Sequence, residues 1–218
     1  MLNFKKYIKI LPIMAFFLLI IGAYEINNNE INTDFYYLEE NVSNNSEFVS
    51  NGIRMNYISK EKVDDELLII KENFIKNLGE NIDIKDNEIS YKDSYKEITA
   101  IVWKDKIDTK VQITYVNNRR TANTIQLKKE IEQIQNIAAK NIKYFKFVKV
   151  KIIEEQKQNI LDVLNNKIEK NTLEELSINN GSSAKAILND GEKINFSFTH
   201  YNSDEYLILG TPVIFVTY

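Results

Sequence analysis

The chain has 218 residues, of which 44% are hydrophobic and 11% aromatic, with two prolines and six glycines; this composition is typical of a folded protein and not of a disordered one. It contains no cysteine, which excludes disulfides, thiol catalysis, zinc–thiolate sites and a lipid-modified cysteine anchor. Three of the 28 basic residues precede the first acidic residue, Glu25, so the rest of the chain has 25 basic and 31 acidic residues. Its net charge of −6 argues against nucleic acid as the main partner.

The first 24 residues have the composition of an export signal. Lys5, Lys6 and Lys9 precede an uninterrupted apolar run from Ile10 to Tyr24, which is the order of the n-region and h-region of a signal sequence. The run is shorter than the ~20 residues of a comfortable membrane span, and Ile-Gly-Ala at 21–23 is an imperfect cleavage motif. We expect residues 1–24 to be a cleaved signal peptide or a retained signal anchor, and the remainder to be extracytoplasmic. A core helix of a cytosolic protein is the third interpretation.

The next segment predicts a polar spacer and a short helix. Residues 25–32 are dominated by acidic and amide side chains. Thr33 and Asp34 then resemble a helix start, and apolar side chains recur at i, i+3 and i+7 from Phe35. This spacing predicts a helix over 34–44, with a plain linker as the alternative.

A strand and a long helix are predicted to follow. Alternating apolar and polar side chains predict a half-buried strand over 52–58. Ser59 is then in the position of an N-cap, and apolar residues at steps of four, three, four and four predict a helix that ends near Asn77, before Gly79. These apolar residues are Val63, Leu67, Ile70, Phe74 and Leu78.

Four strands and a second long helix are predicted in the middle of the chain. The strands are expected over 82–84, 88–91, 96–103 and 109–116. Both alternating sets of the third strand contain apolar residues, so it is expected to be covered on both faces. A polar, cap-rich segment over 117–123 then precedes a helix predicted over 121–140. The apolar residues of this helix are Leu127, Ile131, Ile134 and Ala138.

The last third predicts one helix among further strands. A strand is predicted over 144–153, and a helix over 155–169 with a core face of Leu161, Leu164 and Ile168. The other strands are expected over 173–179 and 183–188, through Ile194, Phe196 and Phe198, and as a final pair between Glu205 and Tyr218.

Two local motifs punctuate these strands. Asn-Asp-Gly at 189–191 predicts a hairpin turn, because Asp-Gly tolerates the positive φ of tight turns. Gly-Thr-Pro at 210–212 breaks the final pair, since proline lacks a backbone donor and glycine permits a kink. We interpret it as a bulge that bends the last strand, with a ligand approaching the exposed backbone as the alternative.

The order of the predicted elements repeats. Helix, strand, helix and several antiparallel strands occur over about 33–118 and again over about 121–203. Residues 113–118 at the end of the first copy resemble residues 198–203 in the second. The sequence therefore predicts an α+β fold: a curved antiparallel sheet with the long helices on one face and the other face free.

The C-terminal residues resemble a known family. "DGEKINFSFTHYN" followed by "LILGTPVIFVTY" at the end of an exported chain is similar to the YwmB family of Gram-positive spore-formers, in which Gly-Thr-Pro, β-branched residues and a closing Tyr recur. Asn195 and Tyr201 also match that pattern. The resemblance is sharp over 190–218 and elsewhere rests on length and element order. It implies a TATA-box-binding-like fold over 33–218, an exported location and an envelope or sporulation association, but no functional residues.

No residue pattern predicts a catalytic, metal or cofactor site. His200 is expected to pack beside Phe196 and Phe198, and Trp103 in the core. Residues 119–120, Arg-Arg, are interpreted as a solvated turn. The acidic clusters at 64–66 and 174–175 are expected opposite the apolar faces or adjacent in sequence, which does not place two carboxylates across a cleft.

The sequence therefore favours a non-enzymatic envelope module, exported or membrane-anchored through its N-terminal segment, whose exposed sheet face binds an envelope protein or a wall polymer. No cofactor is expected. The alternatives are a nucleic-acid-binding saddle, which the charge and the export signal disfavour, and an enzyme with an unrecognised carboxylate site.

Overall fold

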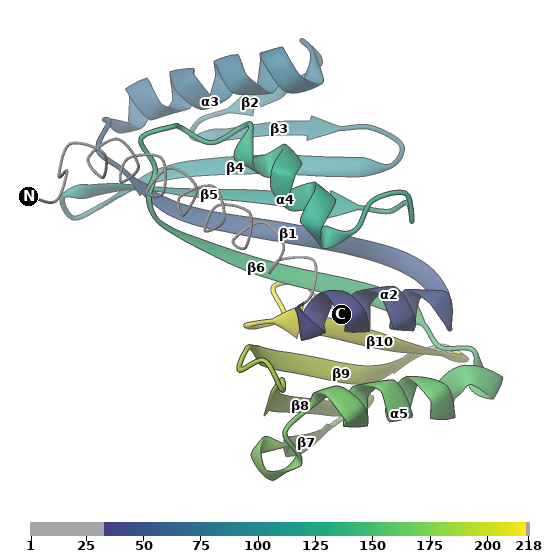
Figure 1. The fold of residues 1–218 in the computed structure, drawn as a ribbon. Helices are drawn as coiled ribbons and strands as arrows, with labels where there is room; N and C mark the ends of the chain where they lie inside the picture. The colour runs from purple at the N-terminus through teal and green to yellow at the C-terminus, as the bar shows by residue number, and fades with distance from the viewer. Residues whose placement is uncertain (1–32, 217–218) are drawn as a thin grey trace, which may run out of the picture. The chain divides into compact units, whose positions relative to one another are not determined.

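The computed structural model describes residues 33–216, so the predicted leader and spacer, residues 1–32, lie outside the described residues. The described chain is built on a ten-stranded antiparallel sheet with the strand order β2-β3-β4-β5-β1-β6-β10-β9-β8-β7 (Figure 1). The α+β class predicted from the sequence is confirmed. Within residues 33–216, no helix has the length and apolar character needed to cross a membrane.

The strands agree with the predicted pattern, although several are longer. Their bounds are β1 Glu47–Ser59, β2 Asp83–Lys85, β3 Glu88–Lys92, β4 Lys96–Asp105, β5 Asp108–Asn117, β6 Lys140–Lys151, β7 Glu174–Ile178, β8 Gly181–Ile187, β9 Lys193–Tyr201 and β10 Asp204–Thr211. β1 and β6 occupy the centre of the sheet, and a bulge between Phe48 and Ser50 shifts the register of their pairing. The predicted turn at 189–191 joins β8 to β9, with Gly191 at φ 87°.

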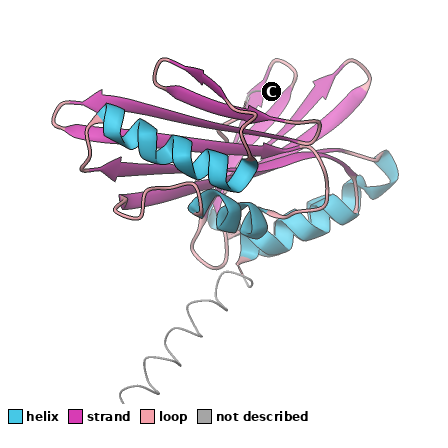
Figure 2. Ribbon diagram, turned by 90° about the horizontal axis from the view of Figure 1, so that it is seen from above, coloured by secondary structure: helices cyan, strands magenta, loops and turns pink. Residues whose placement is uncertain are grey.

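The four α-helices of residues 33–216 cover one face of the sheet, and no helix of this part of the chain lies on the other face (Figure 2). Their bounds are α2 Asp34–Asn44, α3 Val63–Leu78, α4 Thr124–Glu132 and α5 Lys157–Lys167, with short 3-10 turns at Glu154–Gln156 and Lys170–Thr172. The predicted helix over 34–44 is confirmed.

The side chains that alternate toward the helices form two apolar clusters. The first joins β1, β3, β4 and β5 to α3 and α4, and includes Met55, Phe74 and Ile131. The second joins β6, β8, β9 and β10 to α5 and α2, and includes Phe35 and Val150. The period-two burial of β5, in which every second residue is buried, shows how one sheet face supplies these cores.

Three helix predictions need correction. α3 begins after Lys62, because Ser59 belongs to β1 and its hydroxyl donates to the Glu66 carboxylate instead of capping the helix. α4 ends at Glu132 and not near 140, because the side chain of Asn136 donates to Glu66 and draws the chain out of the helical path. α5 buries Ile160, whereas Leu161 is only partly buried.

The predicted final strand pair is wrong for the described residues. β10 ends at Thr211, the Thr211–Pro212 peptide bond is cis, and residues 212–216 form an irregular tail instead of a strand. A Cβ on Gly210 would lie 2.9 Å from the Cα of Ile214, so glycine permits the tail to fold back over β10. Gly-Thr-Pro at 210–212 therefore ends a strand, and is not a bulge within one.

Candidate binding face

The register of the sheet identifies the side chains on its helix-free face. Directly paired residues of antiparallel strands point to the same side. Arg54 on β1 pairs with Thr114 on β5 and with Phe145 on β6, while the neighbouring Ile53 and Met55 point into the core. The helix-free face therefore receives the even-numbered residues of β1 after the bulge and of β5, and the odd-numbered residues of β6 from Lys143 onward; a second register shift, between Asn56 and Ile58, pairs Lys140 with Ile58.

Cationic side chains are concentrated on this face of the three central strands, and we call them the cationic strip. The strip consists of Arg54, Lys110, Lys143, Lys149 and Lys151. The acids that share this face on β1, β5 and β10 are Glu47, Asp108 and Asp204, each of which is the first residue of its strand. The interior of the strip is consequently positive.

Among residues 33–216, ion pairs hold the two ends of the strip. Lys151 contacts Asp204 at 3.0 Å and Glu47 at 3.9 Å, and hydrogen bonding to Asp204 raises the pKa of Lys151. Lys110 pairs with Asp105 on β4. Within residues 33–216, no carboxylate lies within ion-pair distance of Lys143 or Lys149, so their charges are available to a ligand.

Aromatic rings flank one end of the strip. The ammonium of Lys149 lies 5.9 Å from the ring centre of Tyr201 and 5.3 Å from that of Tyr206, and the two rings meet edge to face. Cation–π contacts of this kind position an ammonium without neutralising it. Lys149 therefore keeps a fixed place and a free charge.

The C-terminal tail occupies the middle of the face. The guanidinium of Arg54 lies 4.4 Å from the ring centre of Phe215 and donates to the Phe215 carbonyl oxygen at 3.2 Å. The Phe215 ring also packs edge to face on Phe147, with 5.2 Å between the ring centres. Burial lowers the pKa of Arg54. Arg54 consequently serves the packing of the tail, and Lys143 and Lys149 remain as the accessible cations.

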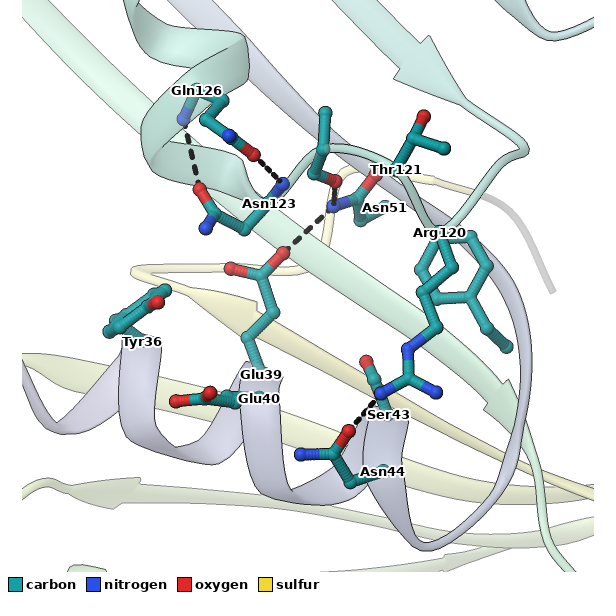
Figure 3. A pocket seen from close by; sticks show the side chains of 12 residues that line it. Tyr36, Glu39, Glu40, Ser43, Asn44, Asn51, Arg120, Thr121, Asn123 and Gln126 are labelled. Atoms are coloured by element: carbon teal, nitrogen blue, oxygen red, sulfur yellow. Dashed lines mark hydrogen bonds between the residues drawn. The ribbon is translucent and has the colours of Figure 1, made fainter.

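A second candidate is a small polar pocket on the helical side, between α2 and the start of α4 (Figure 3). It has a volume of about 220 Å³ and contains the buried Glu39, whose pKa burial raises. The Glu39 carboxylate accepts hydrogen bonds from Asn51 Nδ2 at 2.8 Å, and from the Thr124 amide and hydroxyl at 3.0 and 2.5 Å.

These contacts give Glu39 a structural task. Thr124 is the first residue of α4, where backbone N–H groups lack partners within the helix and favour a carboxylate. Glu39 from α2 therefore satisfies the N-terminus of α4. Glu40 also lines the pocket, but Figure 3 shows its side chain leaving α2 in another direction, so the two carboxylates do not face each other across a cleft.

The residues singled out from the sequence have mixed outcomes. The Arg119–Arg120 turn is exposed, as predicted. His200 was expected to be packed, but its side chain is 58% exposed at the end of β9 and lies 3.5 Å from Glu205. Trp103 was expected in the core, but it points to the helix-free face, opposite Lys110 in the register.

The acidic cluster at 64–66 also departs from the prediction. Glu66 is fully buried and accepts hydrogen bonds from Tyr57, Ser59 and Asn136. Glu66 lies one turn before Ile70, on the buried face of α3. That spacing could have revealed its burial from the sequence.

The accessible lysines of the strip were also missed. Lys143 and Lys149 occur at an even spacing in a strand that alternates lysine with apolar residues. This pattern identifies the polar face of β6 but not the strand pairing that joins it to β1 and β5. Within residues 33–216, no group of three or more histidines and carboxylates is arranged to hold a metal.

No protein-family model matches the chain, and no curated protein matches it.

Proposed function

We propose that the chain is an exported, non-enzymatic module of the cell envelope whose helix-free sheet face binds an anionic polymer of the wall. The lysine-led apolar leader supports the extracytoplasmic location, either secreted or anchored. The main support for an anionic ligand is the cationic strip, which is positive although the chain after the leader is acidic as a whole.

The separation of charge on the surface supports this proposal. After the leader, acidic residues exceed basic ones by six, yet the helix-free face presents Lys143 and Lys149, one on each side of the C-terminal tail, without a carboxylate partner among the described residues. Both lie on β6, six residues apart, which corresponds to roughly 20 Å along a strand. An extended chain with repeated negative charges matches this linear arrangement better than a compact anion does.

We also propose that the domain is a duplicated saddle of the TATA-box-binding-like kind, as its resemblance to the YwmB family implies. The strand order supports a duplication, because it is mirrored about the central β1–β6 pair. β2-β3-β4-β5-β1 is followed by β6-β10-β9-β8-β7, so that β1 corresponds to β6, β5 to β10, β4 to β9, β3 to β8 and β2 to β7. In this scheme the second copy includes β10 and reaches Thr211. β5 then corresponds to β10. Residues 113–118 lie at the end of β5, whereas residues 198–203 lie at the end of β9, so their similarity links two strands that do not correspond in this scheme.

A nucleic-acid-binding saddle is the second candidate, because a phosphate backbone would also be attracted by the cationic strip. The export signal and the acidic balance favour the wall polymer. An enzyme with a carboxylate site is the third candidate, and the Glu39 pocket is its best location. The hydrogen bonds that Glu39 accepts from Asn51 and Thr124 favour the structural role instead.

The proposal is tested by co-sedimentation of the full-length protein, in mild detergent, with isolated cell walls. Walls that keep their anionic polymers should retain the protein, and chemically stripped walls should not. Retention should fall steeply as salt rises, since binding releases counterions. The double variant Lys143→Ala/Lys149→Ala should bind at least about tenfold more weakly.

A matched control is Lys76→Ala/Lys129→Ala, which removes the same charge from exposed positions on the helices of the opposite face. This variant should bind as the wild type does. Equal retention by stripped walls would contradict the proposal. Retention of duplex DNA in a gel shift, at an affinity above that for the wall, would support the nucleic-acid candidate instead.

A further inference from the structure

A pocket of about 570 Å³ lies at one end of the helix-free face, where β4, β5, β1 and β6 meet. Its size falls within the range of small-molecule sites. The lining residues that matter here are Asn56, Ile58, Trp103, Lys110, Ile142 and Lys143.

The register explains how these side chains come together. Trp103 on β4 pairs with Lys110 on β5, and Lys110 pairs with Ile58 on β1. Asn56, two residues before Ile58, pairs with Lys143 on β6. An aromatic ring, an amide and two ammonium groups thus share one face over four adjacent strands.

Asn56 contributes a hydrogen-bond acceptor without a partner to the lining of the pocket. Its Oδ1 atom is buried and has no hydrogen-bond partner within residues 33–216. A buried acceptor without a partner costs stability, and its persistence calls for a group that satisfies it. Asn56 also lines the pocket, and rotation of its amide would turn Oδ1 toward a ligand hydroxyl or amide there.

The charges in the pocket define the ligand further. The Lys110 ammonium is paired with Asp105, whereas no carboxylate of the described chain lies within ion-pair distance of Lys143. Lys143 is therefore the cation available to an anionic substituent, and phosphate is a common partner of lysine in proteins. Trp103 lines the same pocket from β4, where it is partly exposed, and its indole offers a flat apolar surface.

We infer that this pocket binds a phosphate-bearing sugar unit. The C–H face of the ring would pack on Trp103, a hydroxyl would donate to Asn56 Oδ1, and the phosphate would lie against Lys143. This inference deepens the proposed function and depends on it for the choice of a sugar phosphate. Trp103 and Lys143 would equally accept the base and the phosphate of a nucleotide. Within the proposed function the pocket would hold one unit of a polymer that passes beside the C-terminal tail toward Lys149.

The chain contains a single tryptophan, so its fluorescence reports on this pocket. The full-length protein is titrated with N-acetylglucosamine 6-phosphate, N-acetylglucosamine, inorganic phosphate and AMP. The sugar phosphate should give a saturable change in Trp103 emission. The neutral sugar and inorganic phosphate should each bind at least about tenfold more weakly, since each lacks one half of the recognition.

Variants separate the contributions of the individual groups. Lys143→Ala and Asn56→Leu should each weaken binding of the sugar phosphate by about tenfold or more, and Lys76→Ala on α3 should leave it unchanged. Calorimetry extends the test to the tryptophan: Trp103→Leu should lose binding and Trp103→Phe should keep most of it. Thermal melting of each variant excludes loss of the fold as the cause.

The outcomes distinguish this inference from the proposed function. Absence of a saturable change up to about 10 mM sugar phosphate overturns the inference, and wall retention that survives in the same preparation leaves the proposed function intact. Sugar-phosphate binding without wall retention supports the pocket and overturns the proposed function. AMP binding more tightly than the sugar phosphate overturns the choice of ligand and indicates a nucleotide site.

Discussion

At the scale of single residues, buried carboxylates join elements that are distant in the sequence. Glu39 connects α2 to the first turn of α4 through Thr124, 85 residues away. Glu66 gathers Tyr57, Ser59 and Asn136 around one carboxylate, and burial together with this charge raises the pKa of Tyr57, which keeps its hydroxyl a donor. Glu39 thus fixes where α4 starts, and Glu66, through Asn136, fixes where α4 ends.

The raised pKa of Glu39 predicts a pH effect on stability. The folded state holds the proton of the Glu39 carboxyl more tightly than the unfolded state does. The stability that this proton contributes is therefore complete below the pKa of the unfolded state and is lost as pH rises through the pKa of the folded state. As pH falls toward the usual glutamate pKa of 4.5, the wild type should gain stability relative to Glu39→Gln. Urea denaturation at a series of pH values measures this difference.

The neighbouring Glu40 provides the control for this prediction. It is exposed on the same helix, so Glu40→Gln should differ from the wild type by an amount that changes little over the same pH range. The opposite trend for Glu39, with the wild type gaining on the variant as pH rises, would show that the hydrogen bonds from Thr124 and Asn51 outweigh desolvation.

At the scale of elements, the centre of the sheet depends on a close approach between β1 and β6. Gly52 pairs with Phe147, whose ring lies over the position that a side chain would occupy. A Cβ at Gly52 would lie 2.4 Å from Phe147 Cε1 and 2.5 Å from the Tyr115 carbonyl oxygen. The glycine therefore admits a buried aromatic ring at the junction of the two central strands.

Gly52→Ala should consequently destabilise the protein by about 2 kcal/mol or more, because the backbone oxygen cannot yield as a side chain can. Equilibrium unfolding in urea measures the loss. Gly79→Ala is the comparison: no atom lies within 4 Å of its Cβ position, and only its backbone, at φ 92° and ψ −179°, is unfavourable for a side chain, at about 1 to 3 kcal/mol. A loss below about 1 kcal/mol for Gly52→Ala would contradict the steric explanation.

The sequence predicted the elements better than their ends. Alternation predicted the central strands, and apolar spacing predicted α2 and α3, because both depend on local burial patterns. The early end of α4 depends on Asn136 reaching Glu66, 70 residues away, and the end of β10 depends on Ile214 folding back on Gly210. Such contacts between distant residues leave no periodic signal.

The same reasoning applies to the candidate site. Lysine alternation in β6 predicted a polar face, but only strand pairing brings Lys143 beside Asn56 and sets Trp103 on the same side of the sheet. The prediction of a helix-free sheet face was correct, and the identity of its residues required the register.

At the scale of the whole molecule, the two halves of the sequence exchange helices. α2 precedes β1, but Phe35, Leu38 and Val42 belong to the apolar cluster of β6, β8, β9, β10 and α5. α4 precedes β6, but Leu127 and Ile131 belong to the cluster of β1, β3, β4, β5 and α3. Each core therefore contains a helix from the other half, and the β1–β6 pairing joins the cores within the sheet.

This exchange predicts that the halves fold only together. Fragments 33–118 and 121–218 each lack the helix that completes their core, so neither should show cooperative unfolding alone, whereas an equimolar mixture should regain the near-UV circular dichroism of the intact chain. Reassembly should depend on concentration, because the two fragments must associate before either core is complete. Trp103 fluorescence follows the first fragment, and amide spectra by NMR follow the second. A cooperative transition in either fragment alone would show that its core is sufficient without the exchanged helix, and would contradict the prediction that the halves fold only together.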